Sequence, residues 1–118
     1  MIAGLGVDLV EVARIRLAMR RPGFLERILT PSERAEPLSP ERVAGRWAAK
    51  EAVAKAVGTF LRWHDVEISN LPSGQPVAVV SKSACFLDGR VLHVSISHVK
   101  GHAVAVAILE RTEEPART

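Results

Sequence analysis

Apolar and polar positions recur with different periods along the chain, and the first change of period predicts a strand followed by a helix. Residues 2–10 are mostly apolar with two glycines among them, which is typical of a strand that another backbone approaches closely. In residues 12–20 the apolar side chains Val12, Ile15 and Met19 recur at helical spacing, and arginines occupy much of the rest. This segment is therefore predicted to be a helix with one apolar and one basic face.

The longest predicted helix begins after Ser39 and ends at Gly58. Ser39 is a good N-cap, Pro40 suits the first helical position, and Gly58 is a good terminating residue. A shorter helix is expected over 24–29. A capping-box pattern at 30–33 predicts the start of another short helix there. One face of the long helix carries small residues that permit close packing, namely Gly45, Ala49, Ala52 and Ala56.

The second half of the chain has the alternation typical of strands. Four strands are expected, over 65–68, 77–80, 93–98 and 103–109, with a turn at 70–76 joining the first two. The pattern at 81–87 allows a short helix. A polar, frayed tail is expected over 111–118.

Length and composition bound the class of protein. A chain of 118 residues with 47% hydrophobic and 25% charged residues fits one globular domain, which we place at residues 1–110. The single cysteine, Cys85, excludes an intramolecular disulfide and a multi-cysteine zinc site, and it favours a cytoplasmic protein. No apolar run approaches the roughly 20 residues of a membrane span, and no signal-peptide pattern is present, so no membrane partner is expected.

Net charge and aromatic content limit the kinds of partner that the protein can bind. Sixteen Lys and Arg against thirteen Asp and Glu give a net charge of +3, which suggests an anionic partner. Two Trp and three Phe residues are scattered along the chain, so a surface that stacks nucleic-acid bases is not expected. A non-enzymatic basic module that binds nucleic acid or an acidic protein is the alternative to an enzyme.

Two acidic residues are candidates for a metal site. Asp8 interrupts the apolar first strand, and Glu51 lies on the long helix with Lys55 four residues later. Two carboxylates suit a hard cation such as Mg²⁺, which completes its coordination shell with water and substrate phosphate oxygens. Spacing alone also allows a simpler interpretation, in which Asp8 ends a strand and Glu51 pairs with Lys55 at i, i+4.

The histidines and serines give a weaker signal. His98 closes the strand expected at 93–98, where it is either a hydrogen-bonded core residue or a ligand-binding residue. A serine hydrolase is disfavoured because the chain has no G-x-S-x-G nucleophile elbow. The other histidines have no metal-ligand spacing, so zinc is not expected.

Five blocks of the sequence carry a resemblance to a known family. They are G-V-D-L-V-E at 6–11, L-T-P-S-E at 29–33, G-R-W-A-A-K-E-A-V-A-K-A-V-G-T at 45–59, the N…G-Q-P turn at 70–76, and H-V-S-I-S-H at 93–98. In this order they resemble the holo-acyl-carrier-protein synthases, the small stand-alone 4′-phosphopantetheinyl transferases. Three places depart from that pattern. Phe60 stands where a further glycine is usual and the loop from there to Asp65 is short, the segment 81–90 is shorter than a full helix plus connection, and the loop at 99–102 differs from the usual one.

The resemblance implies an α+β fold in which the long helix packs on an antiparallel sheet. It implies transfer of the 4′-phosphopantetheine moiety of coenzyme A to a serine of an apo-acyl-carrier protein, with release of 3′,5′-ADP, in fatty-acid and lipid biosynthesis. It also implies Mg²⁺ held by Asp8 and Glu51, with Lys55 as a catalytic residue that supplies a fixed positive group. The family typically forms homotrimers with active sites between protomers.

Further site residues follow from the same resemblance. The positions implied to bind coenzyme A are Arg46, Lys55, Ser97 and His98, and the fork of an arginine suits phosphate oxygens. The basic face of the first helix is expected to bind the acidic carrier protein through Arg14 and Arg21. A solvated basic surface is the alternative for this face.

Overall fold

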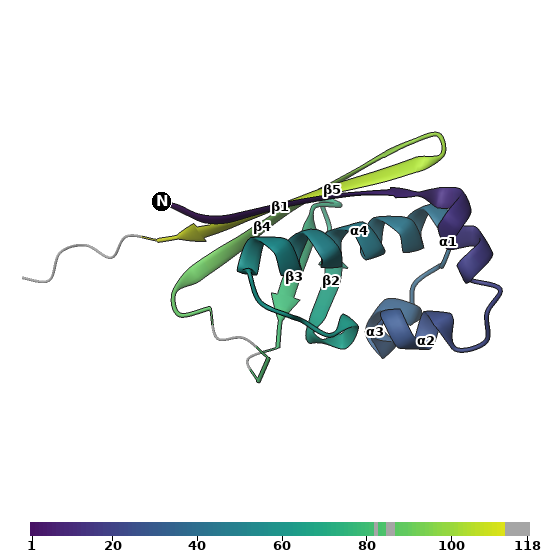
Figure 1. Ribbon diagram of the computed structural model, residues 1–118, viewed down its shortest axis with the longest axis horizontal. Helices are drawn as coiled ribbons and strands as arrows, with labels where there is room; N and C mark the ends of the chain where they lie inside the picture. The colour runs from purple at the N-terminus through teal and green to yellow at the C-terminus, as the bar shows by residue number, and fades with distance from the viewer. Residues whose placement is uncertain (82, 85–86, 113–118) are drawn as a thin grey trace, which may run out of the picture.

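The computed structural model describes residues 1–81, 83–84 and 87–112, and it combines one long helix with antiparallel strands (Figure 1). In chain order the elements are β1 (Ile2–Glu11), α1 (Val12–Ala18), α2 (Phe24–Ile28), α3 (Pro31–Arg34), α4 (Pro40–Val57), the 3-10 helix η1 (Trp63–Asp65), β2 (Val66–Asn70), β3 (Pro76–Val80), β4 (Arg90–Val99) and β5 (His102–Arg111). The α+β fold class expected from the resemblance is confirmed.

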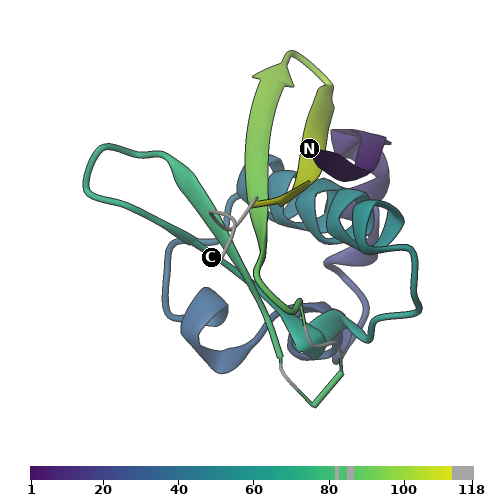
Figure 2. The same ribbon diagram turned by 90° about the vertical axis from the view of Figure 1, so that its left-hand side faces the viewer.

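The three long strands form one antiparallel sheet in the order β1-β5-β4, and β2 and β3 form a separate antiparallel hairpin. Helix α4 runs along one face of the long sheet, and α2 and α3 lie beyond α4 on the side away from that sheet (Figures 1 and 2). The first strand thus pairs with the last, with Asp8 opposite Ala105. Alternate residues of β5, from Ala103 to Leu109, are buried and form the centre of the core.

The two glycines of β1 are required by the closeness of α4. A Cβ atom built on Gly4 would lie 1.8 Å from the carbonyl oxygen of Ala56, and one built on Gly6 would lie 2.0 Å from that of Ala52. No side chain fits in such a gap, so strand and helix meet backbone to backbone. This confirms the close approach that the glycines and the small-residue helix face predict.

Helix α4 begins and ends at the predicted residues. The Ser39 hydroxyl accepts a hydrogen bond from the Arg42 amide at 3.2 Å, and Pro40 occupies the first turn. At the other end Gly58 adopts φ 79°, the left-handed conformation that glycine adopts without strain. Among the described residues, no helix has both the length and the apolar character needed to cross a bilayer.

Strands β1, β3, β4 and β5 extend one to three residues beyond their predicted bounds, and α1 ends at Ala18, two residues before its predicted end. Other segments differ for reasons that the structure shows. Strand β2 begins at Val66 instead of residue 65, because the Asp65 carboxylate accepts a hydrogen bond from the Arg62 amide at 2.8 Å and so closes η1. The short helix allowed at 81–87 falls partly on residues 82, 85 and 86, which lie outside the described residues, and Ser83 and Ala84 form a turn. The expected tail at 111–118 is wrong at Arg111, which is the last residue of β5 and pairs with Met1. Most of the remaining tail, 113–118, lies likewise outside the described residues.

The face of the long sheet opposite α4 is exposed, and the part of it that β1 forms is apolar. The side chains of Leu5, Val7 and Leu9 are 64%, 54% and 66% exposed, because they alternate along β1 with the residues that face the helix. We call this surface the outer face. A contiguous exposed apolar surface of this kind marks an interaction site more often than a free surface.

Candidate active site

Asp8 and Lys55 are brought together by the contact between β1 and α4. Asp8 alternates with the exposed Val7 and Leu9 and therefore faces the helix, where its side chain is 18% exposed. The Lys55 ammonium lies 3.4 Å from the Asp8 carboxylate and donates a hydrogen bond to the Val7 carbonyl oxygen at 2.9 Å. The Lys55 side chain remains 53% exposed, so its charge is accessible to a ligand.

Glu51 lies one turn before Lys55 on α4 and is not paired with it. Within the part of the chain that the structure describes, the Glu51 carboxylate makes no hydrogen bond or ion pair, and Lys55 turns to Asp8 instead. Residues at i and i+4 are neighbours on a helix surface, so Glu51 is close to Lys55 along α4 although Lys55 is paired with Asp8 of β1. The simpler interpretation of Glu51 as the i, i+4 partner of Lys55 is therefore not what the structure shows.

Each of the two carboxylates lines its own cavity. Glu51 lines a cavity of about 330 Å³ with an apolar wall formed by Phe60, Leu61 and Trp63 and a rim that includes Arg27 and Arg62. Asp8 lines a second cavity, of about 390 Å³, between β1, α1 and α2. The Trp47 ring of the second cavity lies 4.4 Å, between ring centroids, from the Trp63 ring of the first. The two cavities thus share an aromatic wall.

Arg14 and Arg21 stand at the cavity that Asp8 lines. The same cavity is lined by Leu17 of α1, Phe24 of α2 and Trp47 of α4, so its floor is apolar while its edge is basic. Phe24 and Trp47 stack with their ring centroids 6.0 Å apart. The structure therefore places both arginines that are predicted to bind the carrier in the lining of the same cavity as Asp8.

Arg46 and His98 line a third cavity, of about 240 Å³, between α4, β4 and the β2–β3 turn. Arg46 donates a hydrogen bond to the Asn70 side-chain oxygen at 2.8 Å, and burial lowers the pKa of its guanidinium. The His98 Nε2 atom lies 3.1 Å from the Glu41 carbonyl oxygen. A Cβ on Gly45 would lie 2.8 Å from this nitrogen, so the glycine leaves room for the imidazole. His98 is exposed, so it is not a buried core residue.

Ser97 is separated from these two residues by the alternation of β4. It is exposed on the outer face, opposite Val104 of β5, whereas Ile96 and His98 face α4. Within one copy of the chain the structure brings Arg46 and His98 together and leaves Ser97 on the other side of the sheet.

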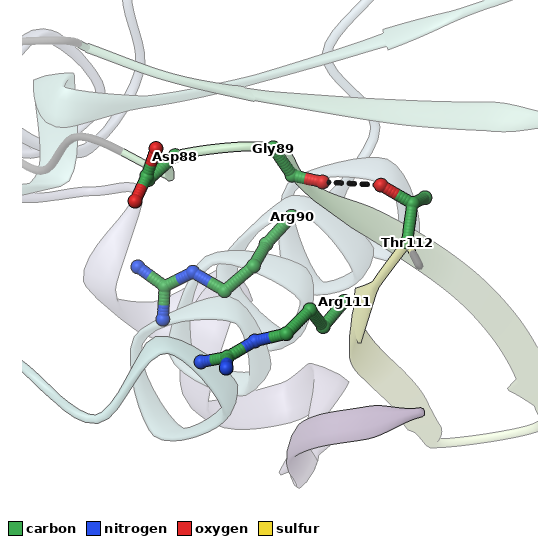
Figure 3. A pocket seen from close by; sticks show the side chains of 5 residues that line it. All are labelled: Asp88, Gly89, Arg90, Arg111 and Thr112. Atoms are coloured by element: carbon green, nitrogen blue, oxygen red, sulfur yellow. Dashed lines mark hydrogen bonds between the residues drawn. The ribbon is translucent and has the colours of Figure 1, made fainter. Parts of the chain in front are cut away.

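A further cavity, of about 450 Å³, lies at the other end of the long sheet and contains none of the predicted site residues. It is lined by Asp88, Gly89, Arg90, Arg111 and Thr112. Arg90 begins β4, Arg111 ends β5, and the two arginine side chains extend along the same side of this pair of strands (Figure 3). Asp8 pairs with Ala105 in the middle of β5, whereas Arg111 ends that strand. This cavity is therefore distinct from the candidate site.

A family model for the 4′-phosphopantetheinyl transferase superfamily matches residues 4–108, which is almost all of the described chain. The chain belongs to this superfamily. A holo-[acyl-carrier-protein] synthase of Anoxybacillus flavithermus is 49% identical, with 94% of this chain and 98% of the relative aligned. The resemblance found in the sequence blocks is confirmed.

Solved structures of the superfamily share the fold. The holo-(acyl-carrier-protein) synthase of Bacillus anthracis, in complex with CoA (3′,5′-ADP), has a TM-score of 0.81 and 40% identity, and the match covers 95% of this chain and 99% of that one. The holo-[acyl-carrier-protein] synthase of Helicobacter pylori, in complex with coenzyme A, has a TM-score of 0.83 and 34% identity over 90% of this chain and 99% of that one.

The sequence did not predict one buried charged pair of this phosphopantetheinyl transferase superfamily member. Lys50 and Glu33 form a salt bridge of 2.6 Å with side chains only 3% and 1% exposed. Burial lowers the pKa of the Lys50 ammonium, and its hydrogen bond to Glu33 opposes that shift. The available signal was a lysine directly before Glu51 on a helix whose neighbouring positions are mostly small and apolar, combined with the glutamate of the capping box.

Proposed function

We propose that this chain is a holo-[acyl-carrier-protein] synthase. It transfers the 4′-phosphopantetheine moiety of coenzyme A to a serine of an apo-acyl-carrier protein and releases 3′,5′-ADP, which serves fatty-acid biosynthesis. The observation that carries the proposal is the contact of Asp8 with Lys55 beside Glu51, on a fold shared with relatives crystallised with coenzyme A. The match covers 99% of each of those relatives.

Asp8 and Glu51 are the residues that would hold Mg²⁺, since carboxylates are the ligands that this cation prefers. No group of three or more potential His, Cys, Asp or Glu ligands occurs in residues 1–81, 83–84 and 87–112, so Asp8 and Glu51 are at most a pair of carboxylates. Mg²⁺ is commonly held by one or two carboxylates and keeps water and phosphate oxygens as its other ligands. When bound, it neutralises negative charge that develops on the pyrophosphate oxygens.

Lys55 and the carboxylates have separate roles in the transfer. The ammonium of Lys55 is fixed by the Val7 carbonyl oxygen and remains half exposed, so it can stabilise charge on the phosphoryl oxygens. The serine oxygen forms a new bond to the phosphorus of the phosphopantetheine group, and the bond to 3′,5′-ADP breaks. The serine proton leaves through a water to Asp8 or Glu51, the two carboxylates beside Lys55.

Coenzyme A is bound between two copies of the chain. Arg46 and His98 would hold nucleotide phosphates in the cavity on the α4 side, whereas Ser97 lies on the outer face. The exposed apolar residues of β1 on that face are covered if protomers associate there. A homotrimer would therefore place Ser97 of one copy against the site of the next. Light scattering that gives the mass of one chain at micromolar concentration would contradict this assembly.

The carrier protein docks at the cavity that Asp8 lines. The positive edge formed by Arg14 and Arg21 attracts an acidic partner, and the apolar floor receives its side chains. The reactive serine is then delivered next to Asp8. The single cysteine, Cys85, rules out an intramolecular disulfide, which supports a cytoplasmic location for this reaction.

The experiment that tests the proposal is incubation of the chain with apo-acyl-carrier protein, coenzyme A and Mg²⁺, followed by intact mass measurement of the carrier. The carrier should gain the mass of one phosphopantetheine group, and a carrier with its serine replaced by alanine should not. Chelation of Mg²⁺ should stop the transfer. An unmodified carrier, together with a rise in melting temperature caused by nucleic acid and not by coenzyme A, would support a basic binding module instead.

A further inference from the structure

A buried ammonium group connects three segments of the chain beside the candidate site. The Lys50 ammonium donates hydrogen bonds to a Glu33 carboxylate oxygen at 2.6 Å, to the Ile28 carbonyl oxygen at 2.8 Å and to the Trp63 carbonyl oxygen at 2.9 Å. An ammonium has three protons, so all of its donors are used. These acceptors belong to the end of α2, to α3 and to η1, which no β-ladder joins.

The partner carboxylate is equally well satisfied. One Glu33 oxygen also accepts a hydrogen bond from the Thr30 amide at 2.8 Å, which is one half of the capping box of α3. The other oxygen accepts a hydrogen bond from the Ile68 amide of β2 at 2.8 Å. The ion pair therefore fixes α2, α3, η1 and β2 to the middle of α4.

This network borders the cavity that Glu51 lines. Lys50 precedes Glu51 on α4, and both residues line the cavity together with Trp63. Residues 59–62, which have no regular secondary structure, connect α4 to η1 and supply the exposed part of the cavity wall. The carbonyl of Trp63 is held by Lys50, and its ring packs against Trp47 at 4.4 Å. Lys50 thus fixes the position of Trp63, where the connecting segment 59–62 ends and η1 begins.

We propose that Lys50 is a positioning residue for the transfer, a role that rests on the proposed function: through Glu33 and the Trp63 carbonyl it holds the cavity wall at a fixed distance from Glu51. Lys50 does not itself contact substrate, because its ammonium is buried and its donors are used. An apolar residue of similar size would fill the space but would leave the three acceptors without a common donor. The identity of the side chain therefore matters to geometry as well as to stability.

Two variants separate geometry from buried charge. K50R keeps the positive charge opposite Glu33, but a planar guanidinium cannot reproduce three bonds that diverge from one nitrogen. The double variant K50Q/E33Q removes both buried charges, so that neither is left unpaired, and its shorter amide does not reach the same acceptors. The matched control is K100Q, which removes a lysine charge from the exposed turn between β4 and β5.

The closing experiment measures kcat and KM for coenzyme A in these variants at a temperature at which each is folded, and records their near-ultraviolet circular dichroism. Trp47 and Trp63 are the only tryptophans in the chain, so this signal reports on their contact. A positioning role predicts that kcat falls at least about tenfold in both variants, with a changed tryptophan signal, as small misplacements near reacting groups cause. K100Q should match the wild type.

The alternative outcomes are distinct. Wild-type kcat in folded K50R or folded K50Q/E33Q would overturn the positioning role, as would failure of both variants to fold, since Lys50 would then be a structural residue only. A wild-type protein that transfers no phosphopantetheine would refute the proposed function. In that case the circular dichroism still shows whether Lys50 holds Trp63 against Trp47.

Discussion

The Asp8 carboxylate lies 3.4 Å from the Lys55 ammonium, although the two residues are 47 positions apart in the chain. The contact exists because Gly4 and Gly6 let β1 lie against the backbone of α4. Without that close approach Asp8 would stand further from the helix. The position of the candidate site therefore depends on residues that carry no functional group.

Replacing Glu51 with glutamine should preserve the fold and remove most of the transferase rate. The amide has nearly the same shape as the carboxylate but brings no negative charge to a hard cation. If metal placement supplies about 4 kcal/mol of transition-state stabilisation, kcat should fall roughly a thousandfold. Because the structure shows no ion pair at Glu51 among the residues it describes, unfolding free energy should change by less than about 1 kcal/mol.

The measurement is a steady-state rate over a series of Mg²⁺ concentrations, with thermal unfolding as the control for folding. Excess Mg²⁺ should recover part of the rate. Near wild-type turnover of E51Q at limiting Mg²⁺ would contradict the role given to Glu51.

Replacing Gly6 with alanine should destabilise the protein more than replacing Gly58 with alanine. The new methyl group at position 6 would meet the carbonyl oxygen of Ala52 at 2.0 Å, so β1 and α4 must separate, at a cost of about 3 kcal/mol or more. At Gly58 no atom lies within 4 Å of the new methyl group, and only the left-handed φ of 79° opposes it, at about 1 kcal/mol. Urea unfolding of both variants measures the difference, and equal losses would show that the close approach is not tight in solution.

Reversing the charge of Arg14 or Arg21 to glutamate should weaken carrier-protein binding and leave coenzyme A binding nearly unchanged. Both residues line the cavity next to Asp8, whereas Arg46 and His98 line another. The effect should be largest at low salt, because screening weakens exposed charge interactions. Affinity measurements for each substrate test this, with Arg20→Glu as the control, since Arg20 is exposed on the same segment and does not line that cavity. Equal loss of both affinities would indicate contact with the nucleotide or damage to the fold.

Replacing Leu9 with glutamate should dissociate the proposed homotrimer. Leu9 is 66% exposed in one copy of the chain, and a charge there cannot be buried in an apolar interface without a large desolvation penalty. Light scattering should show a shift to the mass of one chain; the transfer rate is not the readout, because Leu9 also lines the cavity that Asp8 lines. Val79→Glu is the matched control, because Val79 is 58% exposed but lies on the β2–β3 hairpin. An unchanged mass of the L9E variant would place the subunit contact elsewhere.

Local signals were enough to predict the helix that carries the site. Ser39, Pro40 and Gly58 set its ends through capping and backbone preferences, which depend only on neighbouring residues. The strands followed from alternation in the same way. The start of β2 was missed because Asp65 bonds to the Arg62 amide, a local contact that the alternation pattern does not contain.

The parts of the site that depend on tertiary contacts could not be predicted as fully from the sequence. Lysine is rarely fully buried, and the small apolar neighbours of Lys50 on α4 are only a weak local sign of burial, because the groups that surround its ammonium come from α2, α3 and η1. Alternation predicts that Ser97 and His98 face opposite ways, but not which face α4 covers. Family resemblance grouped both with Arg46, and the structure shows that one copy of the chain groups only His98 with it.

The pairing of β1 with β5 determines when, during synthesis of the chain, the long sheet can form. During synthesis the N-terminal strand emerges first, yet the strand it pairs with is His102–Arg111, near the end of the chain. Even the Met1 amino group donates to the Arg111 carbonyl oxygen, at 3.1 Å. Asp8 therefore has no fixed neighbour across the sheet until β5 has been made, and a product terminated before β5 lacks the central strand of its sheet. Such long-range pairing slows folding, but it also means that the candidate site is assembled only after β5 has joined the sheet.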